Sequence, residues 1–430
     1  MKLMVIGGGG REHAIIKKLK ENPAVEEIYC LPGNGGIAAD AVCVPEIGAK
    51  DISAQVEFAK AHRIDYAVVA PDDPLALGAV DALTEAGIPC FGPDKKAAVI
   101  EASKAFSKDL MKKYGIPTAK YELFTDADAA CAYIDSQGAP IVVKADGLAL
   151  GKGVIVAQTV EEAKAAVRSM IEDKAFGQSG ARVVIEEFME GPEVSVLSFT
   201  DGETVVPMVS SMDHKCALDG DKGPNTGGMG TIAPNPCYAE KIADECMQTI
   251  FLPTIRAMKA EGRPFKGCLY FGLMLTKDGP KVVEYNCRFG DPETQVVLPR
   301  LKNDLVEVML ACANCELDQI ELDWRDEWAV AVVLTSAGYP GSYEKGKVIT
   351  GIEDAEAMEN VTVYHAGTAV VDGQLVTNGG RVLAVTALGD TFENARNLAY
   401  EACEKIDFEG KTLRHDIGLR ALRGRDAWDA

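Results

Sequence analysis

The hydrophobic positions in the first hundred residues alternate between short apolar runs and amphipathic stretches. The apolar runs predict strands at residues 2–6, 27–31, 66–70 and 89–91. Amphipathic spacing predicts helices between them, at residues 11–19 and 54–62 among others. Strands that alternate with helices indicate an open parallel sheet of the α/β class, with ligands at the carboxyl ends of its strands.

The pattern changes twice further along the chain. The middle region combines a helical stretch at 101–114 with strands that end in charged residues and run into glycine-rich loops. From about residue 327, short β runs with glycine turns precede a helix at 391–406, which is typical of a small α+β unit. We therefore expect a multidomain α/β and α+β protein, with domains at 1–101, 102–326 and 327–430.

Composition and charge narrow the class of protein. The formal net charge of -21 disfavours nonspecific binding to nucleic acid or to an anionic membrane. No apolar run reaches the roughly 20 residues of a membrane span, and the apolar start is interrupted by four glycines, unlike a signal peptide. The twelve cysteines show no paired spacing that would indicate disulfides or zinc. We expect a cytoplasmic enzyme.

The strand at 282–286 carries the most informative chemistry. Period-2 alternation places Glu284 and Asn286 on one face, and hard oxygen ligands on a rigid face suit Mg²⁺. Arg288 follows as a fixed cation, and Asp291 lies in the turn after it. A metal site, a cation and an acid in this order indicate phosphoryl transfer. Taken alone, the segment also fits a buried strand that runs into a polar turn.

The glycine turn after the first strand resembles a dinucleotide fingerprint, but it lacks the third glycine. Glu12 occupies that position, and the second strand ends in Pro32, Gly33 and Asn34 with no acid for a ribose. A nicotinamide cofactor is therefore disfavoured. Free backbone N–H groups at a helix start still suit a phosphate, with Arg11 and Asn34 as side-chain partners, unless the glycines only form a tight turn.

Two further clusters in the middle region suit a nucleotide. The strand at 140–144 ends in Lys144 and leads into a loop with glycines that could fold over phosphates as a lid. The strand at 182–189 could offer its backbone to an adenine edge near Phe188 and Met189, and Glu193 could accept from ribose hydroxyls. Core and turn roles are the alternative for these residues.

Residues 213–230 form a polar, glycine-rich stretch without secondary-structure periodicity, and we expect a long functional loop. His214 in this stretch fits either an acid–base role or a structural hydrogen bond.

These motifs together resemble the ATP-grasp enzymes, and among them the phosphoribosylamine–glycine ligase family. The resemblance runs through the whole chain, and the runs at 219–230 and 288–295 are specific to this family and its near relatives. It implies a central ATP-grasp domain with a mobile lid at about 118–192. It also implies ATP-dependent ligation of glycine to 5-phosphoribosylamine through glycyl phosphate, in purine (IMP) biosynthesis, with ATP and Mg²⁺, or Mn²⁺ as the alternative metal.

The resemblance and the residue patterns together assign the site. The metal ligands are Glu284 and Asn286, and the catalytic residues are Arg288, Asp291 and Lys144. The ATP-binding residues are Lys104, Lys144, Gly147, Gly151, Lys152, Gly153, Glu186, Phe188, Met189 and Glu193. The substrate-binding residues are Gly9, Gly10, Arg11, Glu12, Pro32, Gly33, Asn34, Asp72, Asp213, Lys215, Asn225, Thr226, Gly227 and Arg288.

The chain departs from the family pattern at two positions, where Asp72 replaces a glutamate and Cys216 replaces an arginine. We expect a monomer that contacts neighbouring purine-pathway enzymes transiently. Two alternatives are another ATP-grasp ligase, such as a biotin-carboxylase-like or formate-using enzyme, and a nucleotide-binding regulator without catalysis. The retained charged residues argue against the regulator.

Overall fold

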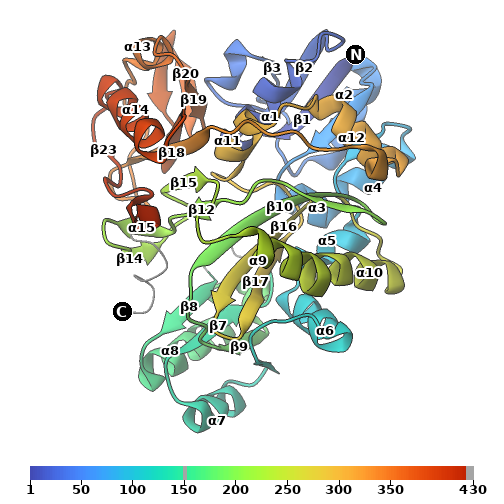
Figure 1. The fold of residues 1–430 in the computed structure, drawn as a ribbon, viewed down its shortest axis with the longest axis vertical. Coiled ribbons are helices and arrows are strands. Elements are labelled where there is room, and N and C mark those ends of the chain that lie inside the picture. Colours follow the sequence, from blue (N-terminus) through green and yellow to red (C-terminus); the bar gives the residue numbers. More distant parts are fainter. Residues whose placement is uncertain (149–152, 423–430) are drawn as a thin grey trace.

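The N-terminal part of the computed structural model is a parallel sheet with the strand order β3-β2-β1-β4-β5 (Figure 1). The structure describes residues 1–148 and 153–422. Strands β1 and β4 are buried on both faces, as central parallel strands are. The elements are β1 Lys2–Gly7, α1 Gly10–Leu19, β2 Glu27–Pro32, η1 Ile37–Ala39, β3 Val42–Cys43, α2 Ile52–His62, β4 Tyr66–Val69, α3 Asp72–Leu77, α4 Ala79–Glu85, β5 Cys90–Phe91 and α5 Lys95–Ala102. The expected parallel sheet is confirmed.

A four-stranded antiparallel sheet follows, in the order β6-β9-β7-β8. Helix α6 (Lys104–Tyr114) precedes this sheet. Ser103 caps its N-terminus by accepting from Phe106 N, and Gly115 ends it in the left-handed conformation. This cap splits the expected helix at 101–114 into α5 and α6. The elements are α6 Lys104–Tyr114, β6 Tyr121–Phe124, α7 Ala127–Gln137, β7 Ile141–Ala145, β8 Val154–Ala157, α8 Val160–Ile171, η2 Gly177–Gly180 and β9 Val183–Glu187.

A second four-stranded sheet, β11-β10-β16-β17, lies between this lid sheet and the N-terminal sheet (Figure 1). Its central strands β10 and β16 are almost continuously buried, and apolar residues of both pack in the core against helices. The elements are β10 Glu193–Asp201, β11 Val205–Pro207, α9 Glu240–Cys246, η3 Met247–Phe251, α10 Leu252–Ala260, β16 Lys266–Thr276, β17 Gly279–Asn286, α11 Thr294–Val297, η4 Leu298–Arg300, α12 Leu305–Asn314 and η5 Leu317–Gln319.

The C-terminal part is a six-stranded sheet packed against α14 (Figure 1). Two of its strands, β12 and β15, come from residues 212–233, so the middle of the chain contributes to this sheet. The elements are β12 Met212–Asp213, β15 Gly230–Ala233, β18 Trp328–Ser336, α13 Ile352–Glu356, β19 Val361–His365, β20 Thr368–Val371, β21 Gln374–Thr377, β22 Arg381–Gly389, α14 Phe392–Lys405, β23 Lys411–Thr412 and α15 Leu419–Leu422.

Two further expectations about local structure were wrong. The stretch 213–230 is not a plain loop, because β13 Cys216–Leu218 and β14 Lys222–Asn225 form a hairpin within it. Gly220 and Asp221 both have positive φ, the geometry of a tight hairpin turn, and this turn gives no periodic signal. The strand expected at 182–189 ends at Glu187 because the chain turns before Gly191. Within the described residues, no helix is both long enough and apolar enough to span a bilayer.

Candidate active site

Glu284 and Asn286 lie on one face of β17, two residues apart. A register shift between Gly272 and Leu273 marks a β-bulge at Val283, just before Glu284. Bulges re-aim neighbouring side chains and free backbone groups, and here the Val283 carbonyl accepts from Lys144 Nζ at 3.3 Å. The bulge thus links the oxygen ligands of β17 to a lysine of the lid sheet.

Positive charge surrounds the Glu284 carboxylate. Lys215 Nζ lies 3.9 Å from Glu284 Oε1. Burial opposes ionisation of this carboxyl, but Lys215, Lys144, Lys104 and Arg288 lower its pKa below the ordinary value. Glu284 is therefore ionised at neutral pH within a group of cations. Such a group can neutralise the charge of a polyphosphate.

Arg288 is held in place by Glu101, a residue that the sequence did not single out. Arg288 Nη2 lies 3.2 Å from Glu101 Oε1 and donates to Asn286 Oδ1 at 3.2 Å. Burial disfavours the charge of Arg288, but Glu101 and then Asp72 raise its pKa above the ordinary value. Arg288 Nε is buried and has no hydrogen-bond partner among the described residues, so a bound anion could satisfy it.

A second buried ion network lies at the end of β7. Both Lys144 Nζ, at 3.0 Å, and Lys108 Nζ, at 3.1 Å, contact the Glu186 carboxylate. Burial lowers the pKa of Lys108 to about 8 in spite of Glu186. The sequence missed Lys108, because a lysine in an ordinary helix gives no local signal.

The start of the lid hairpin is tied to α6. Lys104 Nζ donates to Gly147 O at 3.0 Å, and Gly153 O accepts from Ala145 N at 2.8 Å. Burial lowers the pKa of Lys104. Gly151 and Lys152, which we expect to contact ATP, lie outside the described residues.

The residues expected around the base and ribose lie on both sides of the turn after β9. Glu186 is buried within β9, Phe188 is exposed and Met189 is half-buried. Glu193 begins β10, and its Oε2 lies 3.2 Å from Lys215 Nζ. Lys215 therefore bridges Glu193 and Glu284, two acids assigned to ribose and metal.

Five residues assigned to substrate lie on or beside the β13–β14 hairpin. Lys215 O accepts from both Thr226 N and Thr226 Oγ1 at 2.8 Å, which closes the base of the hairpin. Burial, then the neighbouring Glu293, raises the pKa of Asp213 well above its usual range. Asn225 is exposed, and Gly227 O accepts from Arg381 Nη1 at 2.7 Å.

The two glycine turns of the N-terminal sheet touch each other. A Cβ on Gly8 would lie 2.4 Å from Gly33 O, so the approach requires glycine there. Asn34 Nδ2 donates to Gly8 O at 3.0 Å and to His365 O at 2.8 Å. Pro32 ends β2 directly before Gly33. The turns therefore contact the C-terminal sheet.

Arg11 and Glu12 hold the first glycine turn in place through hydrogen bonds. Glu12 is buried, and its Oε2 accepts from Gly9 N at 2.6 Å. Arg11 Nε donates to Glu12 Oε1 at 2.7 Å, and Arg11 Nη1 donates to Phe289 O at 3.3 Å. The side chains thus brace the turn and join it to the segment after β17.

A pocket of about 360 Å³ opens between these turns and the C-terminal domain. Its lining includes backbone from both parts of the chain and a few polar side chains: Gly8, Gly9, Gly33, Asn34, Asp291, Tyr339, Ala366, Gly367, Thr368, Asn378 and Arg381. Arg381 Nη2 lies 3.4 Å from Asp291 Oδ2, and a Cβ on Gly10 would meet Gln295 Nε2 at 2.6 Å. From the sequence, residues 379–381 could either reach toward the ATP cleft or form only a hairpin turn and a strand start, and the second reading was favoured.

Two neutral histidines lie behind the pocket. His13 Nδ1 accepts from His365 N at 2.8 Å, so His13 Nε2 carries the proton toward Asp40 Oδ2, also at 2.8 Å. Burial lowers the pKa of His13 and brings that of His365 to about 3. His214, in the hairpin segment, is likewise buried and neutral, with a pKa lowered by burial to about 3, which favours the structural role.

The two antiparallel sheets, with charged residues between them, define an ATP-grasp enzyme. The chain belongs to the phosphoribosylglycinamide synthetase family: the N domain of that family matches residues 1–101, the ATP-grasp (A) domain matches 102–294 and the C domain matches 329–420. The family resemblance and the fold class expected from the sequence are confirmed.

The relatives reported next match this chain over nearly all of their own length, and they are named phosphoribosylamine–glycine ligase. Phosphoribosylamine–glycine ligases of Vibrio vulnificus and Halalkalibacterium halodurans are 51% and 50% identical to this chain, over 98% and 99% of its length and 99% and 98% of theirs. The crystal structure of phosphoribosylamine–glycine ligase from Thermotoga maritima is 36% identical, with a TM-score of 0.83 over 97% of this chain and 100% of that chain. A biotin carboxylase from Campylobacter jejuni, at 16% identity and a TM-score of 0.73, shares the fold, and the match covers 96% of this chain and 92% of that one.

Proposed function

We propose that this chain is an ATP-dependent ligase that joins glycine to 5-phosphoribosylamine, giving glycinamide ribonucleotide, ADP and phosphate. The glycine carboxylate attacks the γ-phosphate of ATP to form glycyl phosphate. The amine then attacks the acyl carbon, and phosphate leaves. The reaction belongs to the biosynthesis of purines (IMP), which agrees with the names of the relatives.

The observation that carries this proposal is the convergence of charge on β17. Glu284, with a lowered pKa, lies among Lys104, Lys144, Lys215 and Arg288. These cations stabilise the charge that spreads over the transferred phosphoryl group, and a protein supplies little else in such a reaction. These positive charges come from the lid sheet, the β13–β14 hairpin and the segment after β17. ATP and the acyl acceptor would therefore bind next to each other where these elements converge.

The side chains of β17 fit a Mg²⁺ ion. Mg²⁺ takes one or two carboxylate or amide oxygens from a protein and completes its shell with water and substrate phosphates. Glu284 and Asn286 supply such oxygens from one rigid face. Within residues 1–148 and 153–422, no cluster of three or more His, Cys, Asp and Glu side chains forms a metal site, which agrees with a metal shared with a nucleotide. Glu284 and Asn286 would hold Mg²⁺, or Mn²⁺ in its place, and the metal would supply positive charge to the phosphates of ATP.

The remaining roles follow from position. Lys104, Lys144 and the lid hairpin hold the phosphates, and Glu186, Phe188, Met189 and Glu193 hold adenine and ribose. The pocket at the glycine turns accepts the sugar phosphate of the amine, next to Asp291, which accepts from the glycine ammonium. Arg381 adds a cation to that pocket. Arg11 and Glu12 bind the sugar-phosphate amine from the first glycine turn, where the contacts described above hold them, and Glu101 positions Arg288.

The cellular setting is a reducing one. None of the twelve cysteines, all of which lie in the described residues, forms a disulfide, and most of them are buried. We therefore place the enzyme in the cytoplasm. It acts on small molecules as a monomer, in transient contact with neighbouring purine-pathway enzymes.

Phosphate release from ATP tests the proposed function. We expect release only when glycine and 5-phosphoribosylamine are both present, at a rate that other carboxylates do not reproduce. Hydroxylamine should trap glycyl phosphate as glycine hydroxamate in the presence of ATP and glycine. Release that depends on bicarbonate or formate would instead identify another ATP-grasp ligase, and no release under any of these conditions would indicate a regulator.

A further inference from the structure

The chain after β23 crosses from the C-terminal domain to the β13–β14 hairpin. We call residues 414–420 the C-terminal segment. On its own domain, the segment is anchored to α14: Tyr400 OH donates to Arg414 O at 2.7 Å, and Arg396 donates to His415 O at 2.5 Å and to Ile417 O at 3.0 Å. Ile417 is fully buried in the C-terminal core. The segment is therefore a fixed part of this domain.

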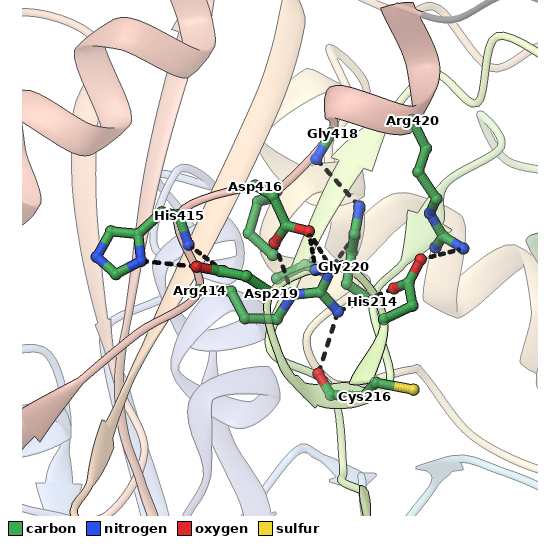
Figure 2. A network of polar contacts seen from close by, with 12 residues as sticks. His214, Cys216, Asp219, Gly220, Arg414, His415, Asp416, Gly418 and Arg420 are labelled. Carbon is green, nitrogen blue, oxygen red and sulfur yellow. Dashed lines mark hydrogen bonds and ion pairs between the residues drawn. The ribbon is translucent and has the colours of Figure 1, made fainter. Parts of the chain in front are cut away.

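Arg414 carries the contact across to the hairpin (Figure 2). Its guanidinium pairs with both oxygens of Asp416, through Nε and Nη2, each at 2.8 Å. Its Nη1 donates to Cys216 O at 3.1 Å and to Asp221 Oδ1 at 3.0 Å. The side chain is only 1% exposed. These hydrogen bonds from one buried guanidinium therefore fix the hairpin strand and its turn together.

Other groups of the segment continue the contact along the hairpin turn. Gly220 N donates to Asp416 Oδ2 at 2.8 Å, and His415 N donates to Asp219 Oδ1 at 2.8 Å. At the hairpin base, the neutral His214 accepts from Gly418 N at 3.0 Å and faces Gly230 O at 3.1 Å (Figure 2). The segment thus holds the hairpin at its turn, along one strand and at its base.

The hairpin leads directly to the proposed site. Cys216, whose carbonyl Arg414 holds, follows Lys215, and Lys215 Nζ lies between Glu193 and Glu284. Lys215 O is itself bonded to Thr226, which fixes the other strand. A shift of the hairpin would therefore move a cation relative to Glu284 and the substrate. Such displacements matter because catalysis depends on preorganised charge.

We propose that Arg414 is a positioning residue, which sets Lys215 and Thr226 for the acyl acceptor by holding the β13–β14 hairpin to the C-terminal domain. It acts through the hairpin and touches no reacting group. The role assigned to Lys215 and Thr226 rests on the proposed function. The contact between Arg414 and the hairpin does not.

The first test is Arg414→Met in the full chain. We expect the KM for 5-phosphoribosylamine, the acyl acceptor, to rise about tenfold, the loss of about one charge-assisted contact, and turnover to fall as well because Lys215 also neighbours Glu284. Arg414→Lys keeps the charge but not the fork of donors, and should recover part of this loss. Asp221→Ala removes one acceptor of Arg414 without leaving that buried cation unpaired, because Asp416 remains. This variant replaces Arg414→Met in the test if Arg414→Met fails to fold.

Hydrogen exchange gives a readout that is independent of activity. In Arg414→Met, amides of residues 216–228 should exchange faster, while those of β1 keep the wild-type rate. The matched control is Arg300→Met, which removes another buried arginine, one that donates to Arg325 O and lies away from the hairpin. It should lower thermal stability without changing either the KM pattern or exchange at 216–228.

Unchanged substrate KM values and unchanged exchange at 216–228 in Arg414→Met would overturn the proposal. So would equal effects of Arg414→Met and Arg300→Met, which would indicate only a structural contribution. The two proposals can fail separately. If the wild-type protein releases no phosphate with glycine and the amine, the function proposed above is wrong. Faster exchange in Arg414→Met would in that case still show that Arg414 holds the hairpin.

Discussion

The pocket at the glycine turns and the region around β17 both gather polar groups, but the groups differ in kind. Backbone of Gly8, Gly9, Gly33 and Gly367 lines much of the pocket, whereas lysine, arginine and carboxylate side chains surround β17. We propose that the first region selects by shape, because a Cβ on Gly8 would lie 2.4 Å from Gly33 O, and that the second acts through charge. Substitutions that remove side-chain atoms should therefore reduce activity most in the β17 region. Substitutions that add side-chain atoms should weaken substrate binding most in the pocket.

The largest effect is expected from Glu284→Ala. Loss of this carboxylate removes a negative ligand whose charge a water molecule cannot replace, and leaves the surrounding cations unbalanced. Turnover should fall by roughly a hundredfold or more, as when one preorganised contact of a transition state is lost. Steady-state phosphate release at several Mg²⁺ concentrations measures this effect.

Asn286→Ala is the matched comparison on the same strand face. It removes a neutral oxygen, which water can partly replace, so the loss should be smaller and excess Mg²⁺ should restore more of it. Binding of 5-phosphoribosylamine should survive in both variants because the pocket uses other residues. Near-normal turnover of Glu284→Ala at low Mg²⁺ would show that the metal is held elsewhere.

Gly8→Ala tests the opposite property of the pocket. The added Cβ would lie 2.4 Å from Gly33 O, so the two turns must separate. Overpacking of this kind costs about 1–3 kcal/mol, and the KM for the amine should rise roughly tenfold while the KM for ATP stays unchanged. Gly48→Ala is the control, because a Cβ there meets nothing within 4 Å. Equal KM values in the two variants would contradict a shape-selected pocket.

Acid should weaken the pocket region through His365. Its pKa is about 3 when folded, because of burial, and the ordinary value is 6.5. Below pH 6.5 the unfolded chain binds more protons, so the free energy of unfolding falls as pH falls, by at most about 1.4 kcal/mol per pH unit from this residue. His365→Phe keeps the ring shape without the titration, and its urea-unfolding free energy should fall less between about pH 7 and pH 5, the range just around the ordinary histidine pKa. Equal slopes would assign the acid sensitivity to other groups.

The sequence revealed elements with a strong local pattern. The period-2 strand with Glu284 and Asn286, and the alternating strands and helices of the first hundred residues, lie where they were expected. Local pattern alone sufficed there, because burial of one face dictates the spacing of apolar residues.

Residues that reach the site from a distance escaped this reasoning. Glu101, Lys108, Arg381 and Arg414 each contact a partner that is far away in the sequence and is brought close only by the tertiary fold. Arg381 follows a pair of glycines, but nothing in the local sequence distinguishes the other three from surface charges. The β13–β14 hairpin was missed because its strands have only 3 and 4 residues, too few to show a period, and its turn depends on backbone geometry.

The smallest effect is expected at the hairpin that follows Lys144, where binding by backbone shape and binding by side-chain charge should combine. Lys104 ties Gly147, at the start of this hairpin, to α6 through Gly147 O. ATP with Mg²⁺ would add contacts to Lys104 and Lys144 and restrain the hairpin, so exchange of amides in residues 144–156 should slow by about severalfold. The β20–β21 hairpin, far from the lysines in sequence and part of the C-terminal domain, is the control and should exchange equally with and without nucleotide. If residues 144–156 also exchange at one rate in both states, the hairpin does not close over the phosphates, and the charge around β17 must hold ATP without a lid.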